Sequence, residues 1–214
     1  MAPMTDVNVR PRSYRQRQAF QTRKLIVQAA RKLFAGGGYG TTSIEAVAGE
    51  AGVSPRTIYA AFGNKKGILA AICEEWLEEA GIQEAVSRGL TEANLSRRLA
   101  VVAQSSRRQW ESERGVVALL EGAATADAEV ARMVAGWKDD RARSLRTVAE
   151  GLETQLRPGL DANDAGAMIR ALTGSEVYRE LVVGEGWSGD KYEQWLNGLL
   201  RQLLVHGGRP VKYS

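Results

Sequence analysis

The chain has 214 residues, 44% of them hydrophobic, and a formal net charge of +4, which suits one larger or two small soluble domains. No apolar run approaches the roughly 20 residues that span a bilayer, and no apolar block follows the basic N-terminus, so we expect no membrane partner and no secretory signal. Cys73 is the only cysteine, which excludes an intramolecular disulfide and fits the reducing cytoplasm.

Positive charge is concentrated near the N-terminus. Residues 1–70 contain 11 Lys and Arg against 3 Asp and Glu, a net charge of +8, whereas residues 71–214 carry a net charge of −4. A surface that faces nucleic acid therefore belongs to the N-terminal third. Residues 1–18 are poor in apolar side chains and are expected to form a disordered basic arm, which either touches DNA or is a solvated tail.

Residues 19–66 are expected to form a small helical domain. Apolar residues recur at three- and four-residue spacing until Gly36, which predicts a first helix. A second helix begins near Thr42, because Glu45 three residues later completes a capping box. Gly52 then allows the chain to turn at low steric cost.

A third helix follows this turn. Ser54 is the expected N-cap, and Pro55 occupies the first helical position, where a missing N–H costs nothing. Ile58 and Phe62 lie four residues apart and are expected to face inward, and Gly63 ends the helix. Two short helices around a tight turn predict a helix-turn-helix, whose second helix enters the major groove of DNA.

The outward side chains of this segment suit DNA recognition. Arg56 can form paired hydrogen bonds with a guanine, and Thr57 can meet a thymine methyl group or a phosphate. Tyr59, Thr42 and Lys65 have the reach and the chemistry for backbone phosphates. The expected DNA-contacting residues are Thr42, Ser54, Pro55, Arg56, Thr57, Tyr59 and Lys65.

Residues 20–72 closely resemble the DNA-binding domain of the TetR (tetracycline-repressor-like) family. The residues that carry the resemblance are Phe34, Gly38-Tyr39-Gly40, Thr42, Val47-Ala48, Ala51-Gly52-Val53-Ser54, Thr57-Ile58-Tyr59, Phe62, Lys65 and Ile68-Leu69. Gly67 departs from the pattern and is expected to weaken the start of the fourth helix, and the small Ala60 and Ala61 leave the third helix fewer contacts. The resemblance implies a dimeric, ligand-responsive transcription regulator, usually a repressor.

The remainder is also expected to be helical, which makes the whole chain all-α: an N-terminal three-helix helix-turn-helix domain and a C-terminal helical domain for ligand binding and dimerisation. The C-terminal domain is expected over residues 67–208, with a flexible tail at 209–214. A fourth helix from about residue 65 to 80 connects the two domains, and a long helix runs from Asp127 to the Pro158-Gly159 pair. No segment shows the alternation of a strand.

An effector pocket is expected between the fourth helix and the long helix. Aromatic and methionine side chains with few charges favour a small apolar or aromatic molecule. The expected liners, each of which is more readily explained as plain core than as a ligand contact, are Trp76, Trp110, Leu120, Met133, Trp137 and Tyr178.

Two closing helices carry wide apolar faces and need a partner. In the resembled family the last two helices pair with their copies, so we expect a homodimer, with intramolecular packing as the alternative. The expected interface residues are Met168, Ile169, Leu172, Tyr192, Trp195, Leu196, Leu199 and Leu203.

Catalytic, metal and cofactor sites are not expected. His206 is the only histidine, so a zinc site or a Ser/His/Asp triad would lack its residues. We therefore expect a regulator that binds a palindromic operator as a dimer and is released by an effector. The alternatives are an activator or a ligand-independent DNA-binding protein of the same fold and, remotely, a helical-bundle enzyme or carrier.

Overall fold

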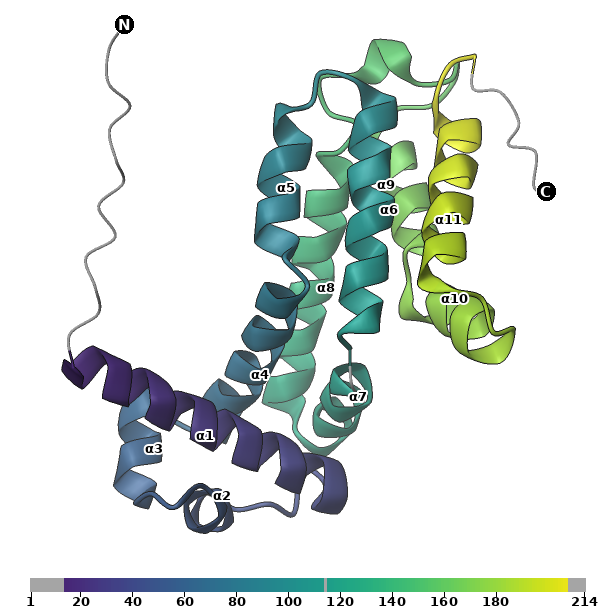
Figure 1. Cartoon of the computed structure of the whole chain (residues 1–214). Helices are drawn as coiled ribbons and strands as arrows, with labels where there is room; N and C mark the ends of the chain where they lie inside the picture. The colour runs from purple at the N-terminus through teal and green to yellow at the C-terminus, as the bar shows by residue number, and fades with distance from the viewer. Residues whose placement is uncertain (1–13, 114, 208–214) are drawn as a thin grey trace, which may run out of the picture. The chain divides into compact units, whose positions relative to one another are not determined.

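The structure is a computed structural model that describes residues 14–113 and 115–207. Over these ranges the chain is all-α, as predicted; the one β-type pairing there is an isolated bridge between Leu156 and Val205 (Figure 1). The chain divides into two compact units, Met1–Ile72 and Cys73–Ser214, which we call the head and the body. None of the helices in the described part is long and apolar enough to cross a membrane.

The head contains four helical segments. They are α1 (Tyr14–Gly37), α2 (Ile44–Ala51), α3 (Pro55–Phe62) and the first turns of α4 (Lys65–Glu79). Helix α1 already includes residues 14–18, so the expectation of disorder is wrong for these five positions of the arm, and residues 1–13 lie outside the described part. The contact-based boundary after Ile72 also differs from the expected one after residue 66.

The start of α2 corrects the predicted capping box. Ser43, not Thr42, is the N-cap, and its hydroxyl accepts a hydrogen bond from the Ala46 amide at 3.1 Å. The Thr42 hydroxyl instead donates to the Gly38 carbonyl at 2.8 Å, so it ties the loop back to the end of α1. Either of the two adjacent hydroxyl residues can serve as an N-cap, although only Thr42 is followed three residues later by a glutamate, and this tertiary bond decides between them.

Gly67 proves necessary for the junction between α3 and α4. A Cβ atom added at Gly67 would lie only 2.0 Å from the carbonyl oxygen of Phe62. The amide of Gly67 also donates to the Asn64 side chain at 2.9 Å, which caps the first turn of α4. The expectation that glycine merely weakens this turn is therefore incomplete, because any larger side chain would collide with backbone.

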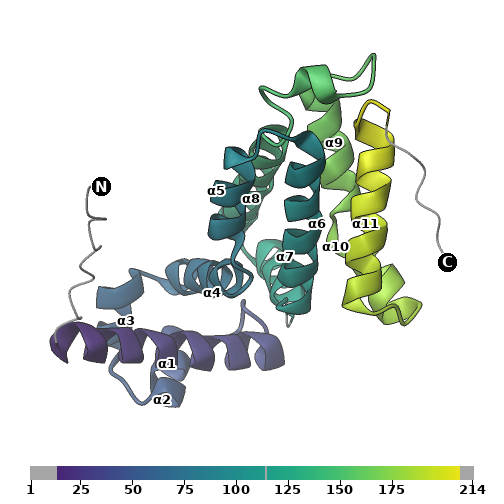
Figure 2. The ribbon, with the colours of Figure 1, turned by 45° about the horizontal axis from the view of Figure 1, so that its top comes forward.

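The body contains the rest of α4 and seven further α-helices in the described residues. They are α5 (Ile82–Thr91), α6 (Leu95–Glu111), α7 (Val116–Ala126), α8 (Ala128–Arg146), α9 (Ala162–Leu172), α10 (Ser175–Tyr178) and α11 (Gly189–Leu204), with a 3-10 turn η1 (Glu153–Gln155) and a π-helical turn η2 (Arg179–Gly184). Helix α6 packs along α11 and against α5, while α8 packs against α7 and α9 (Figure 2).

The predicted long helix ends earlier than expected. It begins as expected at the N-cap Asp127, but α8 stops at Arg146 rather than near Pro158. The guanidinium of Arg98 holds the turn that follows α8, because its Nη1 atom lies 3.1–3.3 Å from the carbonyl oxygens of Thr147, Val148 and Glu150. The same side chain donates to the carbonyls of Leu90 and Glu92 at the end of α5.

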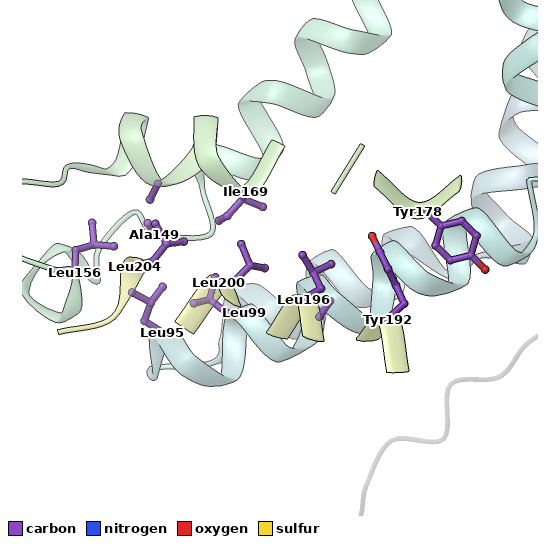
Figure 3. Close-up of a cluster of buried hydrophobic side chains, with 12 residues drawn as sticks. Leu95, Leu99, Ala149, Leu156, Ile169, Tyr178, Tyr192, Leu196, Leu200 and Leu204 are labelled. Carbon is purple, nitrogen blue, oxygen red and sulfur yellow. The ribbon is translucent and has the colours of Figure 1, made fainter. Parts of the chain in front are cut away.

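A leucine-rich core joins α6, α9 and α11 (Figure 3). One side of α11 carries four fully buried residues at four-residue spacing: Tyr192, Leu196, Leu200 and Leu204. Burial of each leucine stabilises the body by roughly 1.5–3 kcal/mol. Helix α9 crosses α8 closely at Gly166, where an added Cβ atom would lie 2.7 Å from the Cα atom of Arg146.

Candidate nucleic-acid interface and body interior

Helix α3 presents its first two turns to solvent. Pro55 and Arg56 are exposed and Tyr59 is 50% exposed, whereas Ile58 is fully buried. Because Ile58 holds the opposite side of the helix on the head core, Arg56 and Tyr59 project outward. Arg56 forms no hydrogen bond or ion pair with any described residue, so its guanidinium donors remain available to a base edge.

Ser54 and Thr57 serve the start of α3. The Ser54 hydroxyl accepts from the Thr57 amide at 3.2 Å and lies 2.9 Å from the Thr57 hydroxyl. Thr57 is half-buried, while Ser54 is exposed. The bond between these two hydroxyl groups uses one O–H donor, so the other O–H remains able to donate to DNA.

Thr42 does not face outward as expected. Its side chain is 8% exposed, and its hydroxyl is bonded to the Gly38 carbonyl. A phosphate oxygen cannot reach a buried donor without displacing this bond. We therefore assign Thr42 to the support of the loop at 38–42 rather than to DNA contact.

Lys65 is also engaged inside the head. Its ammonium group lies 2.7 Å from the carbonyl oxygen of Tyr39, 3.0 Å from that of Thr42 and 3.5 Å from that of Gly40. It also lies 4.3 Å from the centre of the Tyr39 ring, within the range of a cation–π contact. An ammonium group has three N–H donors, so these carbonyls use all of them and leave none for a phosphate.

Sequence reasoning missed two residues of this loop. Tyr39 is 5% exposed and packs edge-on against Phe34, with ring centres 5.2 Å apart, so it fixes the loop on α1. Ser43 is exposed beside the N-terminus of α2. The only signal in the sequence for Ser43 as the N-cap was its hydroxyl group next to Thr42. No signal in the sequence predicted the contact between Tyr39 and Lys65.

Residues 26–72 match the family model described as bacterial regulatory proteins, tetR family. The head is a TetR-family DNA-binding domain. The match covers the second half of α1, all of α2 and α3, and the first turns of α4. A chain that joins this domain to an all-helical body is a DNA-binding transcriptional regulator, as the sequence predicted.

Three solved structures share the fold over most of the chain. NalD of Pseudomonas aeruginosa, the secondary repressor of the MexAB-OprM multidrug efflux pump, is 20% identical with a TM-score of 0.67, covering 88% of this chain and 99% of NalD. The SmeT–triclosan complex is 21% identical with a TM-score of 0.67, covering 90% and 100%. FadR of Bacillus subtilis with stearoyl-CoA is 22% identical with a TM-score of 0.61, covering 83% and 96%. No curated protein matches significantly in sequence.

The tryptophans expected to line an effector pocket have backbone partners in the TetR-like body. The indole N–H of Trp76 donates to the Gln109 carbonyl at 2.8 Å, and that of Trp110 donates to the Thr173 carbonyl at 3.1 Å. The two indole rings lie 5.7 Å apart. Trp76 is buried and Trp110 is half-buried, so Trp76 belongs to the core and Trp110 keeps part of its surface accessible.

The other four expected liners divide in the same way. Leu120 and Tyr178 are buried at 8% and 7% exposure, and the Tyr178 ring packs edge-on against that of Tyr192 at 4.9 Å. Met133 and Trp137 are half-buried on α8. The three half-buried liners Trp110, Met133 and Trp137 therefore remain candidates for ligand contact.

Arg141 was missed by the sequence analysis although it interrupts an apolar stripe. It lies one turn after Trp137 and one turn before Leu145 on α8. Its Nη2 atom donates to the carbonyl and the hydroxyl of Thr173 at 3.0 and 2.9 Å. Desolvation lowers the pKa of the Arg141 guanidinium, yet an arginine stays protonated in proteins. The signal in the sequence was one charged residue among the apolar positions on the inward side of α8.

A depression of about 570 Å³ lies elsewhere on the body, where α4, α5 and α6 meet its rim. Glu78, Glu79, Glu84 and Glu111 line it together with Arg108. None of the six expected liners borders it, and its acidic wall does not suit an apolar effector.

The expected dimer residues lie in two environments. Ile169, Tyr192 and Leu196 are fully buried inside the body, so their assignment to an intermolecular interface is wrong for this fold. The other five are half-buried and keep surface for a partner. They are Met168, Leu172, Trp195, Leu199 and Leu203.

Proposed function

We propose that this regulator is a ligand-responsive repressor that binds a palindromic operator as a homodimer and is released by a small hydrophobic effector. The observation that carries the DNA-binding part is the outward placement of Arg56 and Tyr59 on a helix whose inner side is held by Ile58. The net charge of +8 over residues 1–70 supplies the attraction for the phosphate backbone.

Operator recognition is tested by selection from a random duplex library. We expect a palindrome whose half-sites lie about one helical turn or somewhat more apart. Arg56→Ala should lose about 1–3 kcal/mol of binding free energy and relax the preference at one base pair. Gln28→Ala, at another exposed head position, is the control and should leave the motif unchanged. Failure to enrich any motif would refute sequence-specific binding.

Dimerisation is assigned to the half-buried residues of α9 and α11. Leu199 lies on α11 beside the buried stripe but is not itself fully covered. Leu199→Glu should give folded monomers with much weaker operator affinity, since two heads would no longer bind as one unit. Gln194→Glu places the same charge at an exposed position of α11 and should leave the dimer intact. Light scattering that finds the unmutated protein monomeric at micromolar concentration would contradict the dimer.

The ligand response is supported by the half-buried aromatic and thioether surface of Trp110, Trp137 and Met133. Two proteins of the same fold were solved with molecules that have a large apolar part, triclosan in SmeT and stearoyl-CoA in FadR. An effector releases DNA only if it binds more tightly to the conformation that fits the operator poorly. By linkage, operator DNA must then weaken effector binding by the same factor.

Titration of hydrophobic small molecules tests this response through two readouts, operator affinity and tryptophan emission. All five tryptophans belong to the body sequence, so their emission reports binding there. A ligand that quenches emission and leaves operator affinity unchanged would refute release by that ligand. Transcription in vitro from the selected operator separates the repressor from the activator alternative, because only a repressor lowers the transcript yield.

A further inference from the structure

Arg141 stands on the apolar side of α8. The inward positions of this helix are Val130, Met133, Val134, Trp137, Arg141 and Leu145, and Arg141 is the one charged residue among them. Val130 is fully buried, and the others are half-buried. A cation in such a place loses hydration, which must be replaced by hydrogen bonds or by an opposite charge.

The protein supplies Arg141 with only part of that replacement. Both of its hydrogen bonds go through Nη2 to neutral atoms of Thr173, the C-cap of α9, where the helix dipole favours a cation. Nε and Nη1 have no partner in the described part of the chain. Neither nitrogen is among the fully enclosed, unsatisfied atoms of that part, so both remain accessible.

No carboxylate of the described residues forms an ion pair with Arg141. Desolvation dominates the lowering of its pKa, and the nearby positive charge of Arg170 acts in the same direction. Tyr192 and the exposed Glu176 oppose these effects through space without forming a hydrogen bond to it. Among the described residues, no negative charge therefore lies within ion-pair distance of the guanidinium.

Aromatic and hydroxyl groups surround this cation. Trp110 donates to the same Thr173 carbonyl that accepts from Arg141, so indole and guanidinium converge on one atom. The Tyr192 hydroxyl lies 3.0 Å from the Ser106 hydroxyl. A guanidinium binds an anion through charge-assisted N–H···O bonds, and one such bond remains possible from Nη1 or Nε. Aromatic walls suit an apolar body attached to that anion.

We propose that Arg141 binds the anionic group of the effector, which is therefore an aromatic or apolar acid rather than a neutral molecule. This assignment rests on the ligand response proposed above and narrows its chemistry. Thr173 orients the guanidinium through Nη2, and an N–H of Nη1 or Nε donates a single charge-assisted hydrogen bond to the carboxylate or sulfonate. Trp110 and Trp137 contact the apolar part of the same molecule.

A matched pair of fluorescent probes tests the charge requirement. 8-Anilinonaphthalene-1-sulfonate carries a sulfonate, and N-phenyl-1-naphthylamine is the same aromatic framework without it. With the full-length protein we expect the sulfonate probe to bind about tenfold to a hundredfold more tightly, the range for hydrogen bonds to a charged group. Energy transfer from the tryptophans places the probe in the body.

Variants assign the preference to Arg141. Arg141→Met should bind both probes equally, while Arg132→Met, at an exposed position of the same helix, should keep the full preference. Arg141→Lys retains the charge without the planar guanidinium and should keep part of the sulfonate preference, which guards against a folding defect in the methionine variant. Circular dichroism and the melting temperature check that each variant is folded.

The outcomes separate this assignment from the proposed function. Equal affinity of the unmutated protein for both probes, or an undiminished sulfonate preference in folded Arg141→Met, overturns the anion site. If the neutral probe binds as tightly as the sulfonate probe and lowers operator affinity, the ligand response stands without the anion site. If neither probe binds in the body, both the anion site and a hydrophobic effector of this size are refuted.

Discussion

Lys65→Met removes the ammonium group that joins the first turn of α4 to the loop at 38–42 while keeping the length of the side chain. The two shorter contacts, to the carbonyls of Tyr39 and Thr42 at 2.7 and 3.0 Å, are charge-assisted. Such hydrogen bonds contribute about 1.5–3 kcal/mol each when buried, and Lys65 is only half-buried. We therefore expect the head to lose about 2–3 kcal/mol of stability.

Hydrogen exchange of the buried Ile26 and Val27 amides measures this loss, because the tryptophans report only the body. Lys24→Met, on the exposed side of α1, is the control. It loses only a cation–π contact with the Phe20 ring at 4.8 Å and should change head stability by at most about 1 kcal/mol. Operator binding supplies the deciding readout. A lysine that neutralised one phosphate per head would contribute roughly 0.9 per phosphate to the slope of log affinity against log salt.

Because the carbonyls already occupy the Lys65 ammonium, Lys65→Met should weaken operator binding at every salt concentration without changing that slope. The expectation reverses the one drawn from the sequence, in which this lysine touches phosphate. A slope reduced by about 1.8 in the dimer, together with unchanged hydrogen exchange in the head, would refute the structural role.

Three further substitutions or reactions test the packing. Gly67→Ala should destabilise the head by about 1–3 kcal/mol through overpacking, whereas Gly49→Ala, a helical position with nothing within 4 Å, should be neutral or stabilising in the same exchange experiment. Gly166→Ala should destabilise the body by a similar amount, measured by urea unfolding followed through tryptophan emission. Gly136→Ala, at a helical position that also has no atom within 4 Å, should stabilise the body by about 0.5–1 kcal/mol. Equal effects of the two substitutions within either pair would contradict the close approaches at Gly67 and Gly166. Burial, reinforced by a nearby glutamate, raises the pKa of the Cys73 thiol to about 11. Alkylation of this thiol at pH 8 should therefore be at least about 100-fold slower in the folded protein than in the unfolded protein. Comparable rates in the two states would show that the thiol is accessible.

Local signals in the sequence were sufficient for α3. Ser54, Pro55 and Gly63 each act within one turn of their own position, and the structure places all three as expected. Thr42 and Lys65 behaved differently, because their partners are carbonyl groups brought together by the fold. A sequence shows the charge of a lysine but not which backbone atoms converge on it, so its assignment to phosphate could not be excluded beforehand.

The apolar stripe of α11 illustrates a second limit. Helical spacing groups Leu196 with Leu199 on one wide face, and it cannot tell which part α6 covers. The structure buries Leu196 completely and leaves Leu199 half-buried, so only the latter is suited to a second copy. For Arg141, the sequence showed one charged residue among the apolar positions of α8. Only the structure shows its hydrogen bonds to Thr173.

The guanidinium of Arg98 bears on the order in which the body folds. Its carbonyl partners at Leu90 and Glu92 lie eight and six residues before it, whereas those on the segment after α8 lie 49 to 52 residues after it. Closing the short loop costs far less chain entropy than closing the long one, and local contacts form faster. We expect α5 and α6 to form a hairpin first, in which the Arg98 guanidinium is already held in place. The segment after α8 then binds this guanidinium late in folding, so loss of the arginine should chiefly increase the unfolding rate.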